Sequence, residues 1–534
     1  MKMTQKTCIS ILAALLLLVT LVSCQKDGYE DNSLSTKDAL EEGTRLGRKI
    51  PNPYSITSMQ KALASLQQSE GFNGTIDIVP THLYIKITPQ DSTEMNRVLD
   101  DTTLNLFPYP LDYELVGEGP YIAPEGSEPE IYTVIPADRI LNGVTYTVIE
   151  PCFIPEEEDP NLAKLELESM KLTGNITESE IHQLTIGNTK GLWKKPRGKV
   201  TVKNTFNDNN EGVKNIKVLV SWCVKIASTY TDANGNYQIG RGFLFDVHYS
   251  AVFRNSKGFA VWSNWGPLVP AIHHVGRHDR RGHDIHIGTG SQAWPWATIN
   301  NAARIYYDDM CPYFGVTTPH TPLRIWYWNS EDTAYSGAAP MLSQISMHSI
   351  LQLCSSINLN GEIMNILDIF GLPTIVSRLF LPDIFLYKES ISTKTYYKSV
   401  FHELGHASHF RQVGPLYWEL YIAQTCYNRI IHGSAYGTAS NEFNNVIGVG
   451  EMWGYYFDYK CRNRYFGNTS IRNDDEWFKP QILKEIEEST NINTFDIFHA
   501  LTPDIQSHLA LKKKLKSLYG NEVVIENIFA RHGF

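Results

Sequence analysis

The pattern His402-Glu403-Leu404-Gly405-His406 places two imidazoles four residues apart. On an α-helix, residues at this spacing lie one turn apart on the same face. Two imidazole nitrogens arranged in this way can bind one tetrahedral Zn²⁺ ion, and Glu403 between them can take a proton from a water on that ion. Gly405 lets the helix pack closely against a neighbour. These residues predict a single catalytic zinc site with Glu403 as general base.

Two histidines do not complete such a site, because a catalytic zinc is held by three protein ligands with a fourth position left for water. His409 lies on the same face of the predicted helix as His402 and His406. A straight helix rises roughly 10 Å from residue 402 to residue 409, so one ion cannot contact all three histidines. We therefore expect His409 to lie beside the site and not in it.

Glu451 is the favoured third ligand. It follows His406 by 45 residues, in Gly450-Glu451-Met452-Trp453-Gly454, where aromatic residues continue at helical spacing. Two other acidic residues remain as alternatives, namely Glu442 and Asp458.

The stretch from about residue 380 to about residue 465 resembles the zincin metallopeptidases, and among them the gluzincins. The resemblance rests on His402, Glu403 and His406, and on Glu451 followed by small and aromatic residues. It implies a zinc-dependent peptidase in which Glu403 activates water and returns the proton to the leaving amine. The 45-residue gap before Glu451 is longer than the shortest gluzincin spacing.

Peptide hydrolysis also needs a donor for the oxyanion that develops on the attacked carbonyl. Four side chains could act as this donor, and the sequence does not distinguish among them: His432, Tyr436, Tyr455 and Tyr456. A strand predicted at 382–387 could align an extended substrate by edge pairing. The competing interpretation is a non-enzymatic surface protein that binds glycan or protein and holds a structural metal. No Cys adjoins the motif, and structural zinc sites favour Cys, which argues against that interpretation.

The elements that would position the site are mostly helical after about residue 290. Hydrophobic periodicity predicts strands and helices in this region, with strands at 323–328 and 382–387 and helices at 296–309, 341–353, 416–431, 446–465, 478–488 and 505–518. A small mixed sheet followed by a zinc-binding helix and a helical lobe is the organisation of zincin peptidases. Residues 261–534 are therefore expected to form a zincin-like domain.

Two modules are expected before this domain, so the predicted fold class is multidomain α+β. Residues 56–195 predict a small α+β module, with a helix at 59–66, strands at 82–87 and 131–136, and a second helix capped by Ser92 or Thr93. Residues 196–260 predict short strands and a hairpin turn at Asn234-Gly235. This block resembles the transthyretin-like, carboxypeptidase-regulatory-like β-sandwich, which implies a structural or adhesive role.

Residues 1–23 have the form of a lipoprotein signal peptide, in which lysines precede an apolar stretch. Leu21-Val22-Ser23-Cys24 resembles the bacterial lipobox, so Cys24 is expected to be lipidated and residues 24–55 to form a flexible tether. The residues after Cys24 resemble the tether of Bacteroidetes-type surface lipoproteins. The expected location is the outer membrane, facing either the periplasm or the cell surface.

The formal net charge of −10 over 534 residues argues against nucleic acid as a partner. The resemblance to zincin metallopeptidases implies a peptide or protein substrate. A second group of histidines comprises His273, His274, His278, His283 and His286. Arginines lie among them and would repel a cation, so a polar loop leading into a strand is preferred to a second metal site. Cys426 and Cys461 flank the expected third ligand and are read either as a disulfide or as buried thiols.

Overall fold

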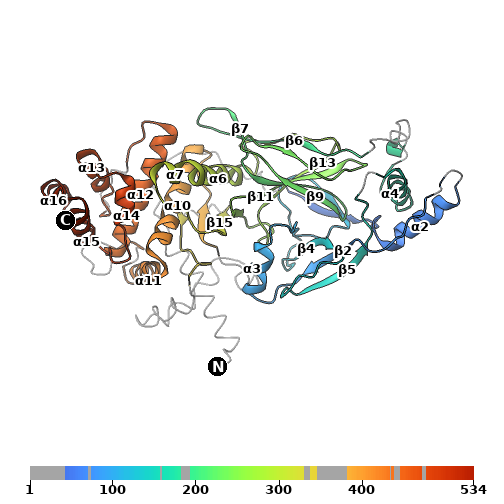
Figure 1. The fold of residues 1–534 in the computed structure, drawn as a ribbon, viewed down its shortest axis with the longest axis horizontal. Helices are drawn as coiled ribbons and strands as arrows, with labels where there is room; N and C mark the ends of the chain where they lie inside the picture. The colour runs from blue at the N-terminus through green and yellow to red at the C-terminus, as the bar shows by residue number, and fades with distance from the viewer. Residues whose placement is uncertain are drawn as a thin grey trace, which may run out of the picture.

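The computed structural model describes residues 43–69, 72, 74–156, 159–177, 179–181, 193–329, 337–345, 382–432, 435–437, 445–471 and 477–534. Within these ranges the chain is a mixed α/β protein with twelve α-helices and several sheets. The strands gather at one end of the molecule and the helices after residue 393 at the other (Figure 1). Cys24, Glu442 and most of the helix expected at 341–353 lie outside the described residues.

The N-terminal part combines two small sheets with three helices. Its elements are β1 (Arg45–Lys49), α2 (Ile56–Gln67), β2 (His82–Ile87), α3 (Ser92–Asp100), β3 (Tyr113–Val116), β4 (Ile131–Pro136), β5 (Tyr146–Cys152) and α4 (Pro160–Leu172). The predicted helix at 59–66 and both predicted strands are confirmed by α2, β2 and β4. The cap of α3 is Asp91, whose carboxylate accepts hydrogen bonds from the backbone N–H groups of Thr93 and Glu94, so the prediction of Ser92 or Thr93 is wrong.

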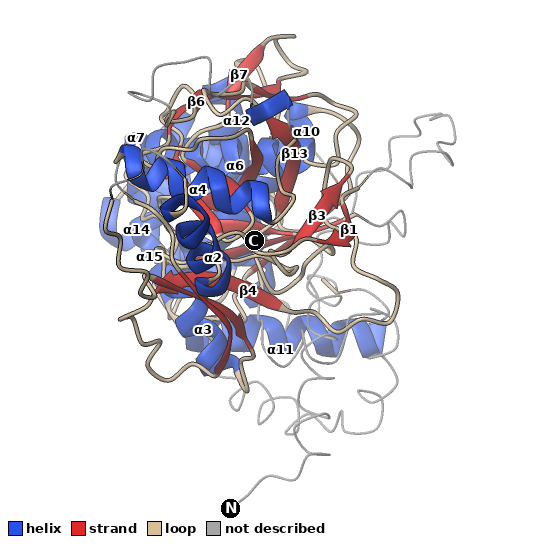
Figure 2. Ribbon diagram, turned by 90° about the vertical axis from the view of Figure 1, so that its right-hand side faces the viewer, coloured by secondary structure: helices blue, strands red, loops and turns tan. Residues whose placement is uncertain are grey.

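Residues 45–49, expected to belong to the tether, form β1 and pair antiparallel with β3. Backbone bonds from Thr44 and Ile50 continue this pairing at both ends, because their N–H groups bind the carbonyls of Pro120 and Asp112. The two strands form a ribbon at the side of the molecule (Figure 2).

Two sheets follow and pack their inner faces into one hydrophobic core. Their strands are β6 (Arg197–Lys203), β7 (Asn210–Gly212), β8 (Ile216–Trp222), β9 (Lys225–Tyr230), β10 (Asn236–Gln238), β11 (Val247–Asn255), β12 (Phe259–Trp262), β13 (Ile272–His278) and β14 (Ile285–Ile287). The smaller sheet has the order β10-β6-β14, with β7 paired to β6. A tight turn does form at Asn234-Gly235, because the N–H of Gly235 bonds to the carbonyl of Asp232 and the N–H of Asp232 bonds to the carbonyl of Asn236. The strands on its two sides do not form a hairpin ladder, since β9 pairs with β8 and β10 pairs with β6. Of the two turn residues, only Gly235 has a positive φ, of 84°.

The larger sheet has eight strands in the order β16-β17-β15-β12-β11-β8-β9, with β13 also paired to β11. It includes β15 (Leu323–Trp328), β16 (Gly337–Ala338) and β17 (Ile384–Tyr387), which confirm the strands expected at 323–328 and 382–387. Strand β12 spans the expected boundary at residue 260 and pairs in parallel with β15. One sheet therefore joins the β-rich segment to the segment that carries the histidine motif.

The second histidine group lies largely on strands and not in a polar loop. His273, His274 and His278 belong to β13, which is antiparallel to β11 and is buried through that pairing. His286 lies on β14, and the rings of His278 and His283 stack with centroids 3.6 Å apart. Within β13, His274 is buried, His273 and His278 are partly buried, and Arg277 is exposed.

The helical end contains α6 (Trp294–Ile305), a π-helix η1 (Tyr306–Met310), α7 (Cys311–Phe314), α10 (Thr393–Val413), α11 (Pro415–His432), α12 (Asn445–Phe466), α13 (Gln481–Ser489), α14 (Thr494–Ala500), α15 (His508–Tyr519) and α16 (Glu522–Arg531). The expected helices at 296–309, 416–431, 446–465, 478–488 and 505–518 are confirmed within a few residues, whereas α14 and α16 were not predicted. Residues 341–345 form a turn and not the start of a helix.

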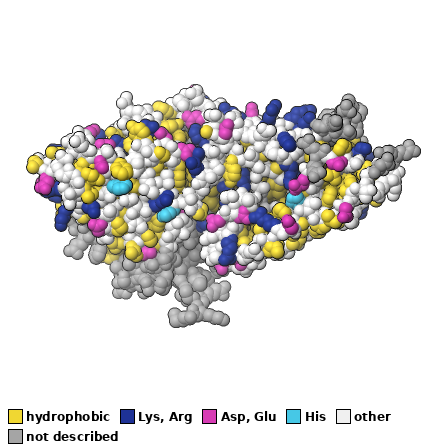
Figure 3. Space-filling view, in the orientation of Figure 1, with side chains coloured by type: hydrophobic (Ala, Val, Ile, Leu, Met, Phe, Trp, Pro, Cys, Tyr) yellow, Lys and Arg dark blue, Asp and Glu magenta, His cyan; other side chains and the backbone are white. Residues whose placement is uncertain are grey.

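Helix α6 connects the sheet to the motif helix, since it packs against β11 and β12 on one side and α10 on the other. Cys461 on α12 is a buried free thiol, which excludes the disulfide considered for it. No helix in the described ranges is long and apolar enough to cross a membrane. Acidic and basic side chains are interspersed on the face shown in Figure 3.

Candidate metal centre

Helix α10 carries the histidine motif through the middle of the helical end. It begins after Ser392, whose side chain accepts a hydrogen bond from the Thr395 N–H, and it ends before Gly414. From Val400 to Phe410 every residue is buried. The hydroxyl of Tyr306 on η1 donates to the carbonyl of Leu404 at 2.9 Å, which links α10 to η1. The motif is therefore held on a rigid, enclosed helix.

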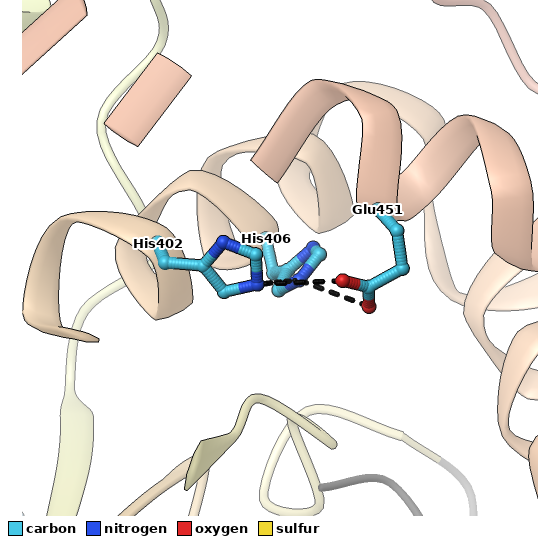
Figure 4. A group of neighbouring side chains, drawn as sticks. All are labelled: His402, His406 and Glu451. Atoms are coloured by element: carbon cyan, nitrogen blue, oxygen red, sulfur yellow. Dashed lines mark hydrogen bonds and ion pairs between the residues drawn. The ribbon is translucent and has the colours of Figure 1, made fainter. Parts of the chain in front are cut away.

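The structure brings His402, His406 and Glu451 together. The two histidines project from α10 and Glu451 projects from α12 toward a common point (Figure 4). Nε2 of His402 lies 3.0 Å from Nε2 of His406, and each of these nitrogens lies 3.4 Å from one oxygen of Glu451. All three residues are at most 4% exposed.

These separations fit a single metal ion. Ligand atoms about 2.05 Å from a tetrahedral ion are about 3.3 Å from one another, close to the three observed distances. Among the described residues, this is the group of His, Cys, Asp and Glu side chains that could hold a metal ion. Two imidazole nitrogens and one carboxylate fill three of the four positions around a tetrahedral ion and leave the fourth for another ligand.

Small residues allow α12 to approach α10 at this point. A Cβ atom at Gly454 would lie 2.8 Å from Cε1 of His406 and 3.0 Å from Cε1 of His402, so any side chain here would push the helices apart. A Cβ atom at Gly405 would lie 3.7 Å from Cα of Gly454, an ordinary contact. The indole Nε1 of Trp453 donates to the carbonyl of Gly405 at 3.0 Å and links the two helices.

Burial and mutual charge set the protonation of the trio. Burial would raise the pKa of Glu451, but the neighbouring imidazoles His406 and His402 outweigh it and hold that pKa well below its usual range. Burial lowers the pKa of His402, with the charge of His406 acting in the same direction. Burial also opposes the charge on His406, yet Glu451 raises the pKa of that imidazole overall. An anionic carboxylate facing imidazole nitrogens is the donor set that a divalent cation needs.

Glu403 lies under the edge of the larger sheet. A Cβ atom at Gly337, on β16, would lie 2.7 Å from Oε1 of Glu403. Strand β17 has β15 on one side and β16 on the other, so the expectation that 382–387 forms a substrate-binding edge is wrong. In the described part of the sheet, the terminal strand beside Glu403 is β16.

Neither alternative ligand belongs to the trio among the described residues. The carboxylate of Asp458 is engaged by the guanidinium of Arg462, with N–O distances of 2.7 Å. Glu442 falls outside the described ranges. His409 is fully buried and packs against Tyr417 and Trp418, with ring centroids 5.0 and 5.9 Å away, as expected for a neighbour of the site.

The four candidate oxyanion donors occupy different surroundings. The ring of Tyr455 lies 4.4 Å from that of His402, beside the trio. The ring of Tyr436 packs 5.0 Å from Phe478. Tyr456 points elsewhere, because its hydroxyl bonds to Glu487 and Thr494. His432 is exposed at the end of α11.

Tyr421 and Trp418, both on α11, contact the trio and were not predicted. The hydroxyl of Tyr421 donates a short hydrogen bond to Glu451, and the ring of Trp418 lies 5.6 Å from that of His406. No local motif marks either residue. The signal available was their spacing of three residues on a predicted helix between the two ligand-bearing helices.

No family model matches the chain, and no curated protein matches it. Among solved structures, a 9R-lipoxygenase from Cyanothece PCC8801 matches with 14% identity and a TM-score of 0.11. The match covers 29% of this chain and 27% of the lipoxygenase chain. A likeness of this size carries no argument about fold or activity.

Proposed function

We propose that this protein is a zinc-dependent hydrolase, and that it cleaves peptide bonds with Glu403 as general base. The observation that carries the proposal is the buried trio His402, His406 and Glu451, whose donor atoms are separated by 3.0 to 3.4 Å. Two histidines and a Glu are a ligand set of catalytic zinc sites, whereas structural zinc sites are commonly closed by four ligands rich in Cys. The gluzincin-like motif supports the same assignment.

Bound at these ligands, Zn²⁺ would supply Lewis acidity and lower the pKa of water toward neutrality. The chain's own part of the reaction is proton transfer and positioning. Glu403 follows His402 directly on α10, accepts the proton of the attacking water and returns it to the leaving amine. Tyr455, whose ring lies beside that of His402, is the best placed of the four candidates to donate to the oxyanion.

An extended substrate is proposed to pair with strand β16. This strand ends the described part of the larger sheet and passes close to Glu403. A peptide that pairs with such a strand presents its carbonyl groups in a regular row, which would bring one of them next to the base. This arrangement favours a peptide or protein substrate.

The test is Glu403→Gln. The variant should retain about one zinc per chain, because the ligands are unchanged, and should lose at least about 100-fold in turnover of a quenched fluorescent peptide library, because the general base is gone. Asp458→Asn, which alters another buried carboxylate of the helical end, should retain both zinc and turnover. Hydrolysis that survives in Glu403→Gln would contradict the proposal.

The location is proposed from the N-terminal sequence, with Cys24 as the lipidated residue that anchors the chain to the outer membrane. Fractionation of cells that express Cys24→Ser tests this, since the altered chain should leave the membrane fraction. A chain that stays with the membrane would refute lipidation at Cys24 as the anchor.

A further inference from the structure

Tyr421 contacts a member of the trio from a third helix. It lies on α11, and its hydroxyl donates a short hydrogen bond to Oε1 of Glu451. Both residues are 1% exposed. In this enclosed setting water does not compete for the hydroxyl, so the bond constrains the carboxylate more than it would at the surface.

The ring of Tyr421 is held in place by its neighbours. It packs 4.7 Å from the ring of Trp418 and 6.3 Å from that of His406. Gly450, the residue before Glu451, leaves the space for this ring, because a Cβ atom there would lie 2.8 Å from Cε2 of Tyr421. The tyrosine is therefore a rigid donor whose position depends on a glycine beside the ligand.

The hydrogen bond determines which way the carboxylate faces. Oε1, which accepts from Tyr421, is the oxygen that lies 3.4 Å from Nε2 of His406, and Oε2 lies 3.4 Å from Nε2 of His402. Rotation of the carboxylate about its last bond would break the bond to Tyr421 and move both oxygens from these positions. Metal-binding carboxylates are commonly oriented by such hydrogen bonds, and loss of one typically weakens metal binding 10- to 100-fold.

We propose that Tyr421 is a positioning residue that holds Glu451 in its metal-binding orientation, and that Gly450 is the residue that makes room for it. The inference rests on the proposed function only in that the trio binds a metal. It assigns no chemical step to Tyr421. Its effect should appear in metal affinity, whatever substrate the protein acts on.

The experiment compares Tyr421→Phe with Tyr417→Phe in the full chain. Tyr417 lies one turn earlier on α11 and also has a buried hydroxyl, but it donates to the carbonyl of Val446 at 3.0 Å and not to Glu451. Zinc affinity is measured by competition with a chromophoric chelator, and the Co²⁺-substituted proteins are compared by visible absorption. Thermal unfolding of the metal-free proteins reports stability separately.

Tyr421→Phe should bind zinc about 10- to 100-fold more weakly and change the Co²⁺ spectrum, whereas Tyr417→Phe should stay within about threefold of the wild type. Gly450→Ala, which displaces the ring of Tyr421 but keeps its hydroxyl, should also weaken zinc binding. This variant replaces Tyr421→Phe in the experiment if Tyr421→Phe does not fold. Equal losses in both tyrosine variants, or an unchanged affinity in Tyr421→Phe, would overturn the inference.

The outcomes separate this inference from the proposed function. A wild-type protein that binds zinc but hydrolyses no peptide would refute the peptidase, and the two tyrosine variants would still decide the role of Tyr421. A wild-type protein that binds neither zinc nor Co²⁺ would refute both.

Discussion

Gly454→Ala is the substitution whose effect on the metal centre can be worked out most fully. The added methyl group would lie 2.8 Å from Cε1 of His406 and 3.0 Å from Cε1 of His402, whereas ordinary contacts of this kind are 3.4 to 4 Å. Helix α12 would have to recede from α10 by several tenths of an ångström, or the imidazoles would have to turn. Either change separates Glu451 from the two Nε2 atoms.

The expected loss follows from the cost of overpacking. An extra methyl group in a close-packed interior costs about 1 to 3 kcal/mol, and relaxation that relieves it moves the ligands out of reach of a common ion. Since about 1.4 kcal/mol corresponds to a tenfold change in affinity, zinc binding should weaken by about 10- to 100-fold. Chelator competition measures this directly, with circular dichroism as the check on folding.

Gly405→Ala is the matched control at the same helix crossing. Its methyl group would lie 3.7 Å from Cα of Gly454 and 3.9 Å from Cδ1 of Phe457, which are ordinary contacts. Zinc affinity should therefore stay within about threefold of the wild type. Full zinc affinity in Gly454→Ala, or an equal loss in both variants, would refute the reasoning.

Two further predictions concern the base and the response to acid. Gly337→Ala should leave zinc affinity unchanged but lower turnover at least about tenfold, because its methyl group would lie 2.7 Å from Oε1 of Glu403; unchanged turnover would show that β16 does not constrain the base. Burial lowers the pKa of His274 to about 3 and that of His508 to about 4. Below about pH 6.5 the unfolded chain therefore binds protons that the folded chain does not, and the free energy of unfolding decreases as the pH is lowered. Urea unfolding of the metal-free protein should therefore show about 2 kcal/mol less stability per histidine at pH 5 than at pH 7.5, and stability independent of pH over this range would contradict it.

The convergence of His402, His406 and Glu451 could be predicted because helical geometry relates spacing to direction. Residues 402 and 406 share a helical face wherever that helix lies, and the rise per residue was enough to set His409 aside. The proximity of Glu451 to the two histidines was harder to predict, because it depends on the close packing that Gly454 and Gly450 allow. The sequence does show these small residues on both sides of Glu451. The observed ranges of the helices around the site agree with the ranges predicted from hydrophobic periodicity, because helical spacing is also visible in the sequence.

The remaining features depend on partners that are distant in the sequence. Tyr421 carries no local signal, because its role arises only when α11 crosses the end of α12. Strand β16 is two residues long and has no pattern of its own. The histidines of β13 resembled a loop because their burial comes from pairing with β11, and β1 resembled a tether because its pairing partner lies more than 60 residues away. In each case the structure of the segment depends on tertiary contacts more than on its local composition.

The central claim is that His402, His406 and Glu451 hold one zinc ion with a position open to solvent. Anomalous diffraction at the zinc edge, from crystals of the zinc-loaded protein, tests it most directly. One peak is expected about 2.0 to 2.2 Å from Nε2 of both histidines and from a Glu451 oxygen, with no fourth protein ligand. A zinc peak elsewhere, or a fourth side chain closing the site, would contradict it.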